Sequence, residues 1–143
     1  MMAHDAVVVD SSVWIDYFNA KHSLQTDLLD RLLDTFGSQI IVPDVVLAEV
    51  LRGFRLEREY QNAKKLMSTF NIASTGGAQL AMDAANHYRS LRSIGVTVRS
   101  FVDVWIATFC IHHDLPFLHN DRDYDPLEQH RGLYVLHTSN DLE

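Results

Sequence analysis

Short apolar runs alternate along the chain with longer amphipathic stretches. Residues 6–10 (AVVVD) and 39–42 (QIIV) are rich in β-branched side chains, a composition typical of buried parallel strands. Residues 116–120 (PFLHN) and 133–136 (LYVL) have the same character, and residues 71–73 (NIA) are consistent with a brief strand. The pattern therefore predicts about five short strands.

The stretches between these runs have the periodicity of helices. Ser11 and Ser12 favour a helix start for residues 11–18, because serine hydroxyls cap the first free N–H groups of a helix. Apolar side chains recur every three or four positions in residues 78–95, whereas residues 103–114 are apolar almost all round, as in a buried helix. Further helices are expected at residues 23–36, 44–54, 56–70 and within 123–130.

Strands that alternate with helices predict an α/β fold, here a three-layer sandwich around a central, mainly parallel sheet. A length of 143 residues without an internal repeat, a low-complexity stretch or a linker predicts one domain over residues 1–143. A hydrophobic content of 47% indicates a globular core and argues against disorder.

Composition also restricts the compartment. No apolar run reaches the roughly 18 residues of a membrane-spanning helix. The first ten residues carry acids where a signal peptide needs basic residues. The single cysteine, Cys110, lies in an apolar stretch and is expected to be a buried thiol rather than a nucleophile. We therefore expect a cytoplasmic protein without a membrane partner.

Acidic residues occupy the positions where apolar runs meet helix starts or loops. Asp10 closes the first strand, Asp103 opens the buried helix, and Asp121 follows the penultimate strand. Asp123 comes two positions later, and Glu49 lies on a mostly apolar stripe of its helix. In open parallel sheets, functional groups gather beyond the carboxyl ends of the strands. Gathered carboxylates repel one another, and a divalent cation held by oxygen ligands is the usual compensation, so the pattern predicts a metal-dependent enzyme.

Each acid alone also has a structural interpretation. Asp10 and Asp103 can cap the helices beside them, and Asp121 can hold a turn. Glu49 can form an ion pair with Arg52. All four acids together are harder to explain as coincidental caps, because each lies at a strand end or on an inner helix face.

Other chemistries fit the sequence less well. The chain contains no G-x-S-x-G nucleophile motif and no glycine-rich phosphate-binding loop. Its histidines do not form a zinc signature: adjacent His112 and His113 are expected on the surface at a helix end, and His119 is expected to pack on the sheet. The formal net charge of −7 argues weakly against a nucleic-acid partner, but bound metal would neutralise several acids, so net charge decides nothing.

Four segments carry a resemblance to a known family. They are VVVDSSVWID (7–16), VPDVVLAEVLRGF (42–54), SFVDVWIATFCIHHDLPFLHNDRDYDPL (100–127) and LYVL (133–136). Over essentially its full length the chain resembles PIN-domain ribonucleases, specifically the VapC-type toxins of bacterial toxin–antitoxin pairs. The resemblance implies that the acidic metal site consists of Asp10, Glu49, Asp103 and Asp121, with Asp123 as an auxiliary acid.

The resemblance also implies supporting residues and departures. Ser12 and Ser100 match hydroxyl positions of the family and would hydrogen-bond the acids and fix their rotamers. The family often has threonine at these two positions, and phenylalanine where this chain has Tyr124. Neither departure threatens the implied chemistry.

The implied function is that of a Mg²⁺- or Mn²⁺-dependent endoribonuclease toxin that hydrolyses phosphodiester bonds in tRNA or ribosomal RNA. The implied partners are a cognate VapB-type antitoxin, the RNA substrate and a second copy in a homodimer. The candidates for RNA phosphate contacts are Arg52, Arg89, Arg92 and Arg99. Trp14 and Tyr17 are expected in the core rather than stacked on a base.

Two alternatives remain at the level of sequence. One is a phosphoryl-transfer α/β domain, such as a phosphatase or a phospho-acceptor receiver. A dehalogenase-like phosphatase needs D-x-D, but Asp10 is followed by two serines, and the segment 71–77 offers no acceptor aspartate for a receiver. The other alternative is a non-catalytic module of the same fold that docks a partner protein.

Overall fold

The sheet at the centre of the molecule has four parallel strands. A computed structural model describes residues 6–36, 39–137 and 141; residues 1–5, on which the expectation of no signal peptide partly rests, lie outside this description. The strands are β1 (Val7–Val9), β2 (Ile40–Pro43), β3 (Asn71–Ala73) and β4 (Phe117–Leu118). Their order in the sheet is β3-β2-β1-β4.

The direction in which successive strands are added to the sheet reverses at β1. After β1 the chain adds β2 and β3 on one side, and it then returns to place β4 on the other side of β1. Val8 pairs with Ile41 on one edge and with Phe117 on the other. In open α/β sheets, ligands bind in the crevice at the carboxyl ends of the strands where the order reverses. The carboxyl ends of β1 and β4 are therefore the place to look for a site.

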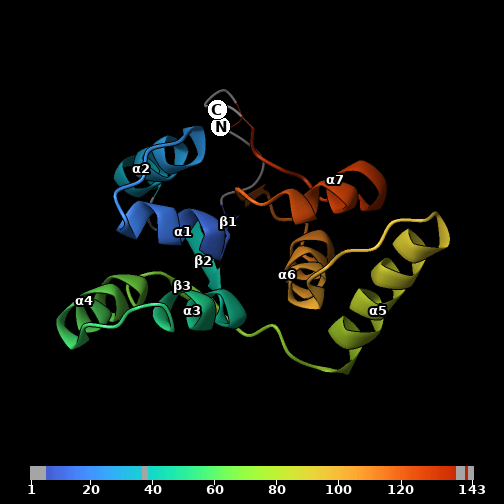
Figure 1. Ribbon diagram of the computed structural model, residues 1–143, viewed down its shortest axis with the longest axis horizontal. Helices are drawn as coiled ribbons and strands as arrows, with labels where there is room; N and C mark the ends of the chain where they lie inside the picture. Colours follow the sequence, from blue (N-terminus) through green and yellow to red (C-terminus); the bar gives the residue numbers. More distant parts are fainter. Residues whose placement is uncertain (1–5, 37–38, 138–140, 142–143) are drawn as a thin grey trace.

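Helices cover the sheet in two groups. Figure 1 shows the first group on the left of the sheet and the second on the right. The first comprises α1 (Ser11–Phe18), α2 (Leu24–Phe36), α3 (Asp44–Leu51) and α4 (Glu57–Met67); the second comprises α5 (Ala78–Ser93), α6 (Phe101–His112), the 3₁₀ turn η2 (Arg122–Tyr124) and α7 (Asp125–Arg131). The expected α/β sandwich with a parallel sheet is confirmed. Among the described residues, no helix combines the length and apolarity needed to cross a membrane.

The expected fifth strand is present only as a single bridge. Val135 pairs in parallel with Phe117, and the backbone N–H of Leu136 donates to the Phe117 carbonyl at 2.9 Å. The segment therefore lies beside β4, but Gly132 precedes it in the left-handed conformation (φ 82°) and redirects the chain after α7. The helix expected to open at Asp103 begins two residues earlier, at Phe101.

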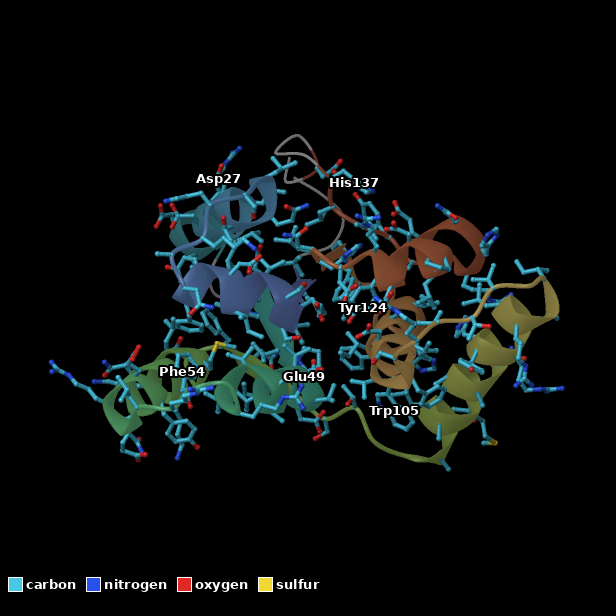
Figure 2. The ribbon with its side chains drawn as sticks, in the orientation of Figure 1. Asp27, Glu49, Phe54, Trp105, Tyr124 and His137 are labelled. Atoms are coloured by element: carbon cyan, nitrogen blue, oxygen red, sulfur yellow. The ribbon has the colours of Figure 1, made fainter. Side chains whose placement is uncertain are left out.

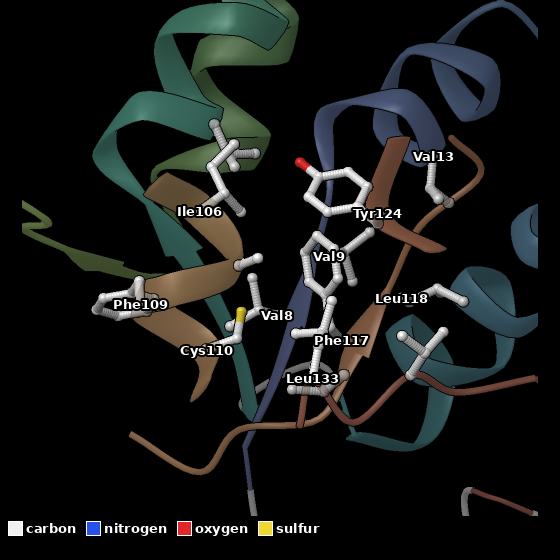
Figure 3. Close-up of a cluster of buried hydrophobic side chains, with 14 of the residues drawn as sticks. Val8, Val9, Val13, Ile106, Phe109, Cys110, Phe117, Leu118, Tyr124 and Leu133 are labelled. Atoms are coloured by element: carbon white, nitrogen blue, oxygen red, sulfur yellow. The ribbon is translucent and has the colours of Figure 1, made fainter. Parts of the chain in front are cut away.

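The core contains residues of the strands and of helices from both groups, and α6 contributes a large share of it. Nearly every residue of α6 from Val104 to Cys110 is buried, Trp105 excepted: Val104, Ile106, Ala107, Thr108, Phe109 and Cys110. Figure 3 shows Cys110 on the side of α6 that faces Val8 of β1, whereas the Phe109 ring points away from the strands. Burial raises the pKa of the Cys110 thiol well above its usual value, so this cysteine is inert, as expected. Trp14 is also fully buried and packs against Phe18 and Phe70.

Two hydrogen bonds through Thr75 join the two groups of helices. The Thr75 hydroxyl, just after β3, donates to Asp44 Oδ1 at 2.6 Å at the start of α3. The Trp105 indole N–H, from α6, donates to the Thr75 carbonyl at 2.7 Å. Because α3 carries Glu49 and α6 carries Asp103, these hydrogen bonds fix the helices that present two of the candidate acids.

Candidate metal centre

Asp10 lies directly after β1 and is both the cap of α1 and a member of the acid cluster. Its Oδ2 accepts hydrogen bonds from the Ser12 N–H at 3.1 Å and from the Ser12 hydroxyl at 2.6 Å. Its Oδ1 accepts one from the Tyr124 hydroxyl at 2.8 Å. The residue is only 3% exposed. The capping interpretation is thus correct in geometry, and it leaves one lone pair of Oδ1 for another ligand.

Asp103 lies in the first turn of α6, where it is 9% exposed. Burial, followed by the nearby charges of Asp10 and Asp121, raises the pKa of its carboxyl to about 7. Ser100 precedes the helix, and its backbone carbonyl accepts from the Asp103 N–H at 3.2 Å. Within the described part of the chain, the Ser100 hydroxyl donates to none of the acids.

Glu49 reaches the cluster from α3 and is half-buried. Figure 2 shows it on the side of the first group of helices, with Tyr124 on the side of α6 and α7. Burial raises the pKa of the Glu49 carboxyl, Ser11 opposes that rise, and Asp10 adds to it. The Ser11 hydroxyl donates to Glu49 Oε1 at 3.0 Å. Over the described residues, no ion pair joins Glu49 to Arg52, although the charge of Arg52 lowers the pKa slightly.

Ser11→Ala isolates the effect of this hydrogen bond. Since the hydroxyl stabilises the charged carboxylate, its loss should raise the pKa of Glu49 further. An NMR titration of the side-chain carboxyl in the metal-free protein measures the shift. Ser93→Ala is a matched control, because that hydroxyl donates to the Ser90 carbonyl of its own helix. An unchanged Glu49 titration in Ser11→Ala would show that the contact does not persist in solution.

Asp121 and Asp123 follow β4 and complete the cluster. Asp121 caps η2, and its Oδ1 accepts from the Asp123 N–H at 2.9 Å. The carboxylates of Asp103, Asp121 and Asp123 each offer an oxygen, and these oxygens lie within 4.8 Å of one another. Asp10 joins this trio through Tyr124, whose hydroxyl also lies 3.2 Å from Asp103 Oδ1. The structure therefore brings all five acids to the carboxyl ends of β1 and β4.

The donor set of the acid trio (Asp103, Asp121 and Asp123) fits a hard divalent cation. All three ligand groups are carboxylates, which suit Mg²⁺ or Mn²⁺ and not a soft metal that prefers sulfur or imidazole. Among the described residues, Arg99 is the only basic side chain that forms an ion pair with the trio. Its guanidinium lies 3.4 Å from Asp123 Oδ1. The Arg99 side chain is 85% exposed, so solvent screens this pair and leaves the repulsion among the acids largely uncompensated.

The contacts of the Tyr124 hydroxyl with Asp10 and Asp103 were not predicted from the sequence. Its ring is fully buried and packs against Phe117 and His119, with centroid distances of 4.8 and 4.9 Å. Figure 3 shows the ring beside Val9 and Phe117 with its oxygen at the margin of the apolar cluster. A buried tyrosine hydroxyl needs a partner. That requirement indicates only that the Tyr124 hydroxyl has a polar partner, and it does not identify Asp10, 114 positions away, as that partner.

His119 lies beside the cluster and packs on Phe117 at the end of β4. Its Nδ1 accepts from the Asp121 N–H at 3.1 Å, so the hydrogen of the neutral ring is on Nε2. Burial lowers the pKa of the imidazole, which favours this neutral form. Nε2 is buried and has no hydrogen-bond partner among the described residues.

The candidate RNA-contact arginines are distributed unevenly. Arg99 lies at the rim of the acid trio, and Arg52 is near enough to Glu49 to affect its pKa. Arg89 and Arg92 are exposed on α5, and the Arg92 guanidinium lies over the Tyr88 ring, 5.7 Å from its centroid. His112 and His113 are exposed at the end of α6, as expected.

Comparison with known proteins decides the family. The model of the PIN domain matches residues 7–128, which include all five acids. The chain belongs to the PIN-domain family. A protein named Ribonuclease VapC11, from Mycobacterium tuberculosis, is 29% identical over 127 residues, covering 89% of this chain and 95% of that protein.

Solved structures of PIN-domain proteins share the fold. A DNA-bound VapBC complex from Salmonella typhimurium contains a chain that is 17% identical, with a TM-score of 0.75, covering 92% of this chain and 96% of that one. VapC20 from Mycobacterium tuberculosis, described as a toxin that cleaves the sarcin–ricin loop, is 16% identical with a TM-score of 0.60, covering 84% and 93% of the two chains. At these identities the likeness establishes the fold alone.

Proposed function

We propose that this PIN-domain protein is the endoribonuclease toxin of a toxin–antitoxin pair and hydrolyses phosphodiester bonds in structured RNA such as tRNA or ribosomal RNA. The observation that carries the proposal is the convergence of Asp10, Glu49, Asp103 and Asp121 at the carboxyl ends of β1 and β4. The names of its relatives, a VapC ribonuclease and VapBC complexes, favour RNA as the substrate and a VapB-type antitoxin as the partner.

Asp103, Asp121 and Asp123 would hold a Mg²⁺ or Mn²⁺ ion, with Asp10 and Glu49 completing the acidic site. When bound, such an ion lowers the pKa of water, orients the phosphate and neutralises charge on the leaving oxygen. Ser12 holds Oδ2 of Asp10 by two hydrogen bonds, and the Tyr124 hydroxyl holds Oδ1, so that the two residues together fix the carboxylate.

Glu49 has the properties of a proton acceptor in this site. Its pKa is raised by burial and by the charge of Asp10, which brings it closer to neutral pH than that of an exposed glutamate. The Ser11 hydroxyl holds one of its oxygens and leaves the other available to orient a water beside the scissile phosphate. A general base of this kind needs both the position and the perturbed pKa, and Glu49 combines them.

RNA binding by this negatively charged chain would depend on local cations. Arg52 lies near Glu49 and Arg99 pairs with Asp123, and Arg89 and Arg92 are exposed on α5. Contacts of this type release counterions from RNA, so affinity should fall steeply with salt. We also propose a homodimer, and a cytoplasmic location because the RNA substrate and the antitoxin are found there.

The test is RNA cleavage by the purified chain with Mg²⁺ or Mn²⁺, compared with the same mixture after chelation. Cleavage should require the ion, and sequencing of RNA 5′ ends after induction in cells should show a small set of cut sites. Asp10→Asn controls for contaminating nuclease and should be inactive.

Two outcomes would contradict the proposal. Hydrolysis of a small phosphate ester without RNA cleavage would indicate a phosphatase. Inhibition of translation that persists in Asp10→Asn would indicate a protein that acts by docking a partner.

A further inference from the structure

We propose that a pocket beside the acid trio binds one unpaired nucleotide of the RNA, next to the scissile phosphate. This inference rests on the proposed ribonuclease function and deepens it, because it assigns part of the substrate to a defined place. The pocket has a volume of about 600 Å³. That volume falls in the range of ligand pockets, about 300 to 1,000 Å³, and is ample for one nucleotide.

The position of the pocket makes it a continuation of the acidic site. Asp121 belongs both to the acid trio and to the lining of the pocket. Arg99, which pairs with Asp123, lines the pocket as well. A phosphate held at the acids would therefore place an adjacent nucleotide at the pocket entrance. The lining comes from four separate segments: Gln25 on α2, Arg99 before α6, His119 to Arg122 with Asp125 after β4, and Val135 to His137.

The lining combines the groups that bind a base. The side-chain amides of Gln25 and Asn120 supply donors and acceptors for a base edge. The Asn120 amide nitrogen lies 3.4 Å from Asp16 Oδ2, which leaves its carbonyl oxygen as an acceptor. Buried Val135 and Leu136 provide apolar surface for the face of the base. Bases splayed out of single-stranded RNA are recognised by this combination of edge contacts and stacking.

His137 adds an aromatic surface at the mouth of the pocket. Its imidazole is 61% exposed, and Nε2 lies 2.6 Å from Glu128 Oε2 on α7, which holds the ring in place. Figure 2 shows His137 on the same side of the molecule as Tyr124. His119 also contributes to the wall of the pocket.

The charges of the pocket favour a phosphate-bearing ligand over a peptide. Arg99 and Arg122 line it together with Asp121 and Asp125. Once Asp121 is engaged by a cation, the arginines outnumber the free carboxylates, and the sugar–phosphate of a nucleotide complements that surplus. A segment of the antitoxin remains the competing occupant that the experiment must separate.

The experiment uses a single-stranded RNA oligonucleotide that spans a mapped cut site, with one nucleotide at a time replaced by an abasic ribose. The intact protein should lose about 10- to 100-fold in kcat/KM at one position adjacent to the cut, and little elsewhere. In the double variant Gln25→Ala/Asn120→Ala, the ratio between the kcat/KM values of intact and abasic RNA should shrink to about 2-fold. Gln61→Ala, an exposed amide on α4, is the matched control.

Each result has a definite meaning. The abasic penalty is the loss of kcat/KM that one abasic ribose causes. The nucleotide pocket would be overturned if this penalty were equal at all positions, or if it were the same in the double variant as in the intact protein. Either result would leave the ribonuclease function intact. If the protein cleaves no RNA at all, the proposed function fails and there is no cut site. The pocket is then tested by anisotropy binding, in Mg²⁺, of a single-stranded RNA and of its abasic counterparts, and equal affinities would overturn it. If the double variant weakens antitoxin binding without changing the abasic penalty, the pocket binds peptide and the inference is wrong.

Discussion

Asp103→Asn is expected to change cleavage and stability in opposite directions. With Mg²⁺, RNA cleavage should fall about 100- to 1,000-fold, because the substitution removes a charged ligand group from the place where charge develops in the reaction. Without metal, the melting temperature should rise, because the variant removes the charge of one buried carboxylate that is repelled by the other acids of the cluster.

The sign of the stability change follows from the pKa of Asp103. Its pKa is about 7 in the folded protein, against an ordinary value of 3.8. As pH rises through this interval the unfolded chain loses the proton first, so the folded state binds more protons and the free energy of unfolding falls. This loss of free energy of unfolding is absent below pH 3.8 and complete above pH 7. Its upper limit is about 4 kcal/mol, and asparagine removes it.

Thermal unfolding in a chelator at pH 4, 6 and 8 measures this effect. The variant should gain stability over wild type mainly at pH 8, by several degrees, since about 1 kcal/mol shifts the melting temperature of a protein of this size by roughly 2 to 4 °C. Asp34→Asn, an exposed acid on α2, should show no such gain. Added Mg²⁺ should stabilise wild type more than the variant. Equal Mg²⁺-induced shifts would show that Asp103 is not part of the metal site.

Asp10→Asn should not show the same stabilisation. Asp10 accepts three hydrogen bonds, from the Ser12 N–H, the Ser12 hydroxyl and the Tyr124 hydroxyl. Asparagine can accept on one oxygen only, so at least one of these donors loses its partner, which costs about 1 to 3 kcal/mol when the donor is buried. Relief of repulsion and loss of hydrogen bonds therefore oppose each other at this position.

The sequence located the acids because each follows from local rules. A β-branched run that ends in aspartate predicts both a strand end and a carboxylate beyond it, and Asp10 lies there. Glu49 was recognisable as a charge on an apolar helix stripe. By contrast, the Tyr124 hydroxyl meets Asp10 across 114 positions, and no local pattern reports such a contact.

The length of strands and the shape of the pocket were also beyond the sequence. β4 has only two residues, and residues 133–136 pair through one bridge, because tertiary packing rather than β-propensity decides where a ladder stops. The nucleotide pocket takes its lining from segments more than 100 positions apart, Gln25 and His137 among them. Such surfaces depend on the packing of helices on the sheet, which composition and periodicity do not specify.

Tyr124→Phe should reduce cleavage by changing the response to metal rather than the binding of RNA. The hydroxyl carries one hydrogen, and the shorter of its two contacts, 2.8 Å to Asp10 Oδ1, is the one that it donates to. Burial, followed by the charge of Asp10, raises the pKa of this phenol well above its usual value, so the hydrogen is retained. Tyr124 thus holds Asp10 at a fixed position facing Asp103.

Phenylalanine keeps the ring contacts with Phe117 and His119 and removes only the oxygen. Without the donor, Asp10 is held by Ser12 alone and can rotate about its side-chain bonds. Loss of such a supporting hydrogen bond typically lowers metal affinity or activity about 10- to 100-fold. We expect kcat to fall by this factor at low Mg²⁺, KM for RNA to change little, and high Mg²⁺ to restore much of the rate.

The dependence on Mg²⁺ separates a positioning role from a merely structural one. Tyr60→Phe, the same deletion on α4 and away from the acids, should leave both the rate and the Mg²⁺ requirement unchanged. If Tyr124→Phe lowers the melting temperature but leaves the Mg²⁺ requirement at the wild-type value, the hydroxyl only stabilises the fold. A restored rate at high Mg²⁺ would instead mean that a tyrosine oxygen, itself no ligand, determines how readily the five acids accept their cation.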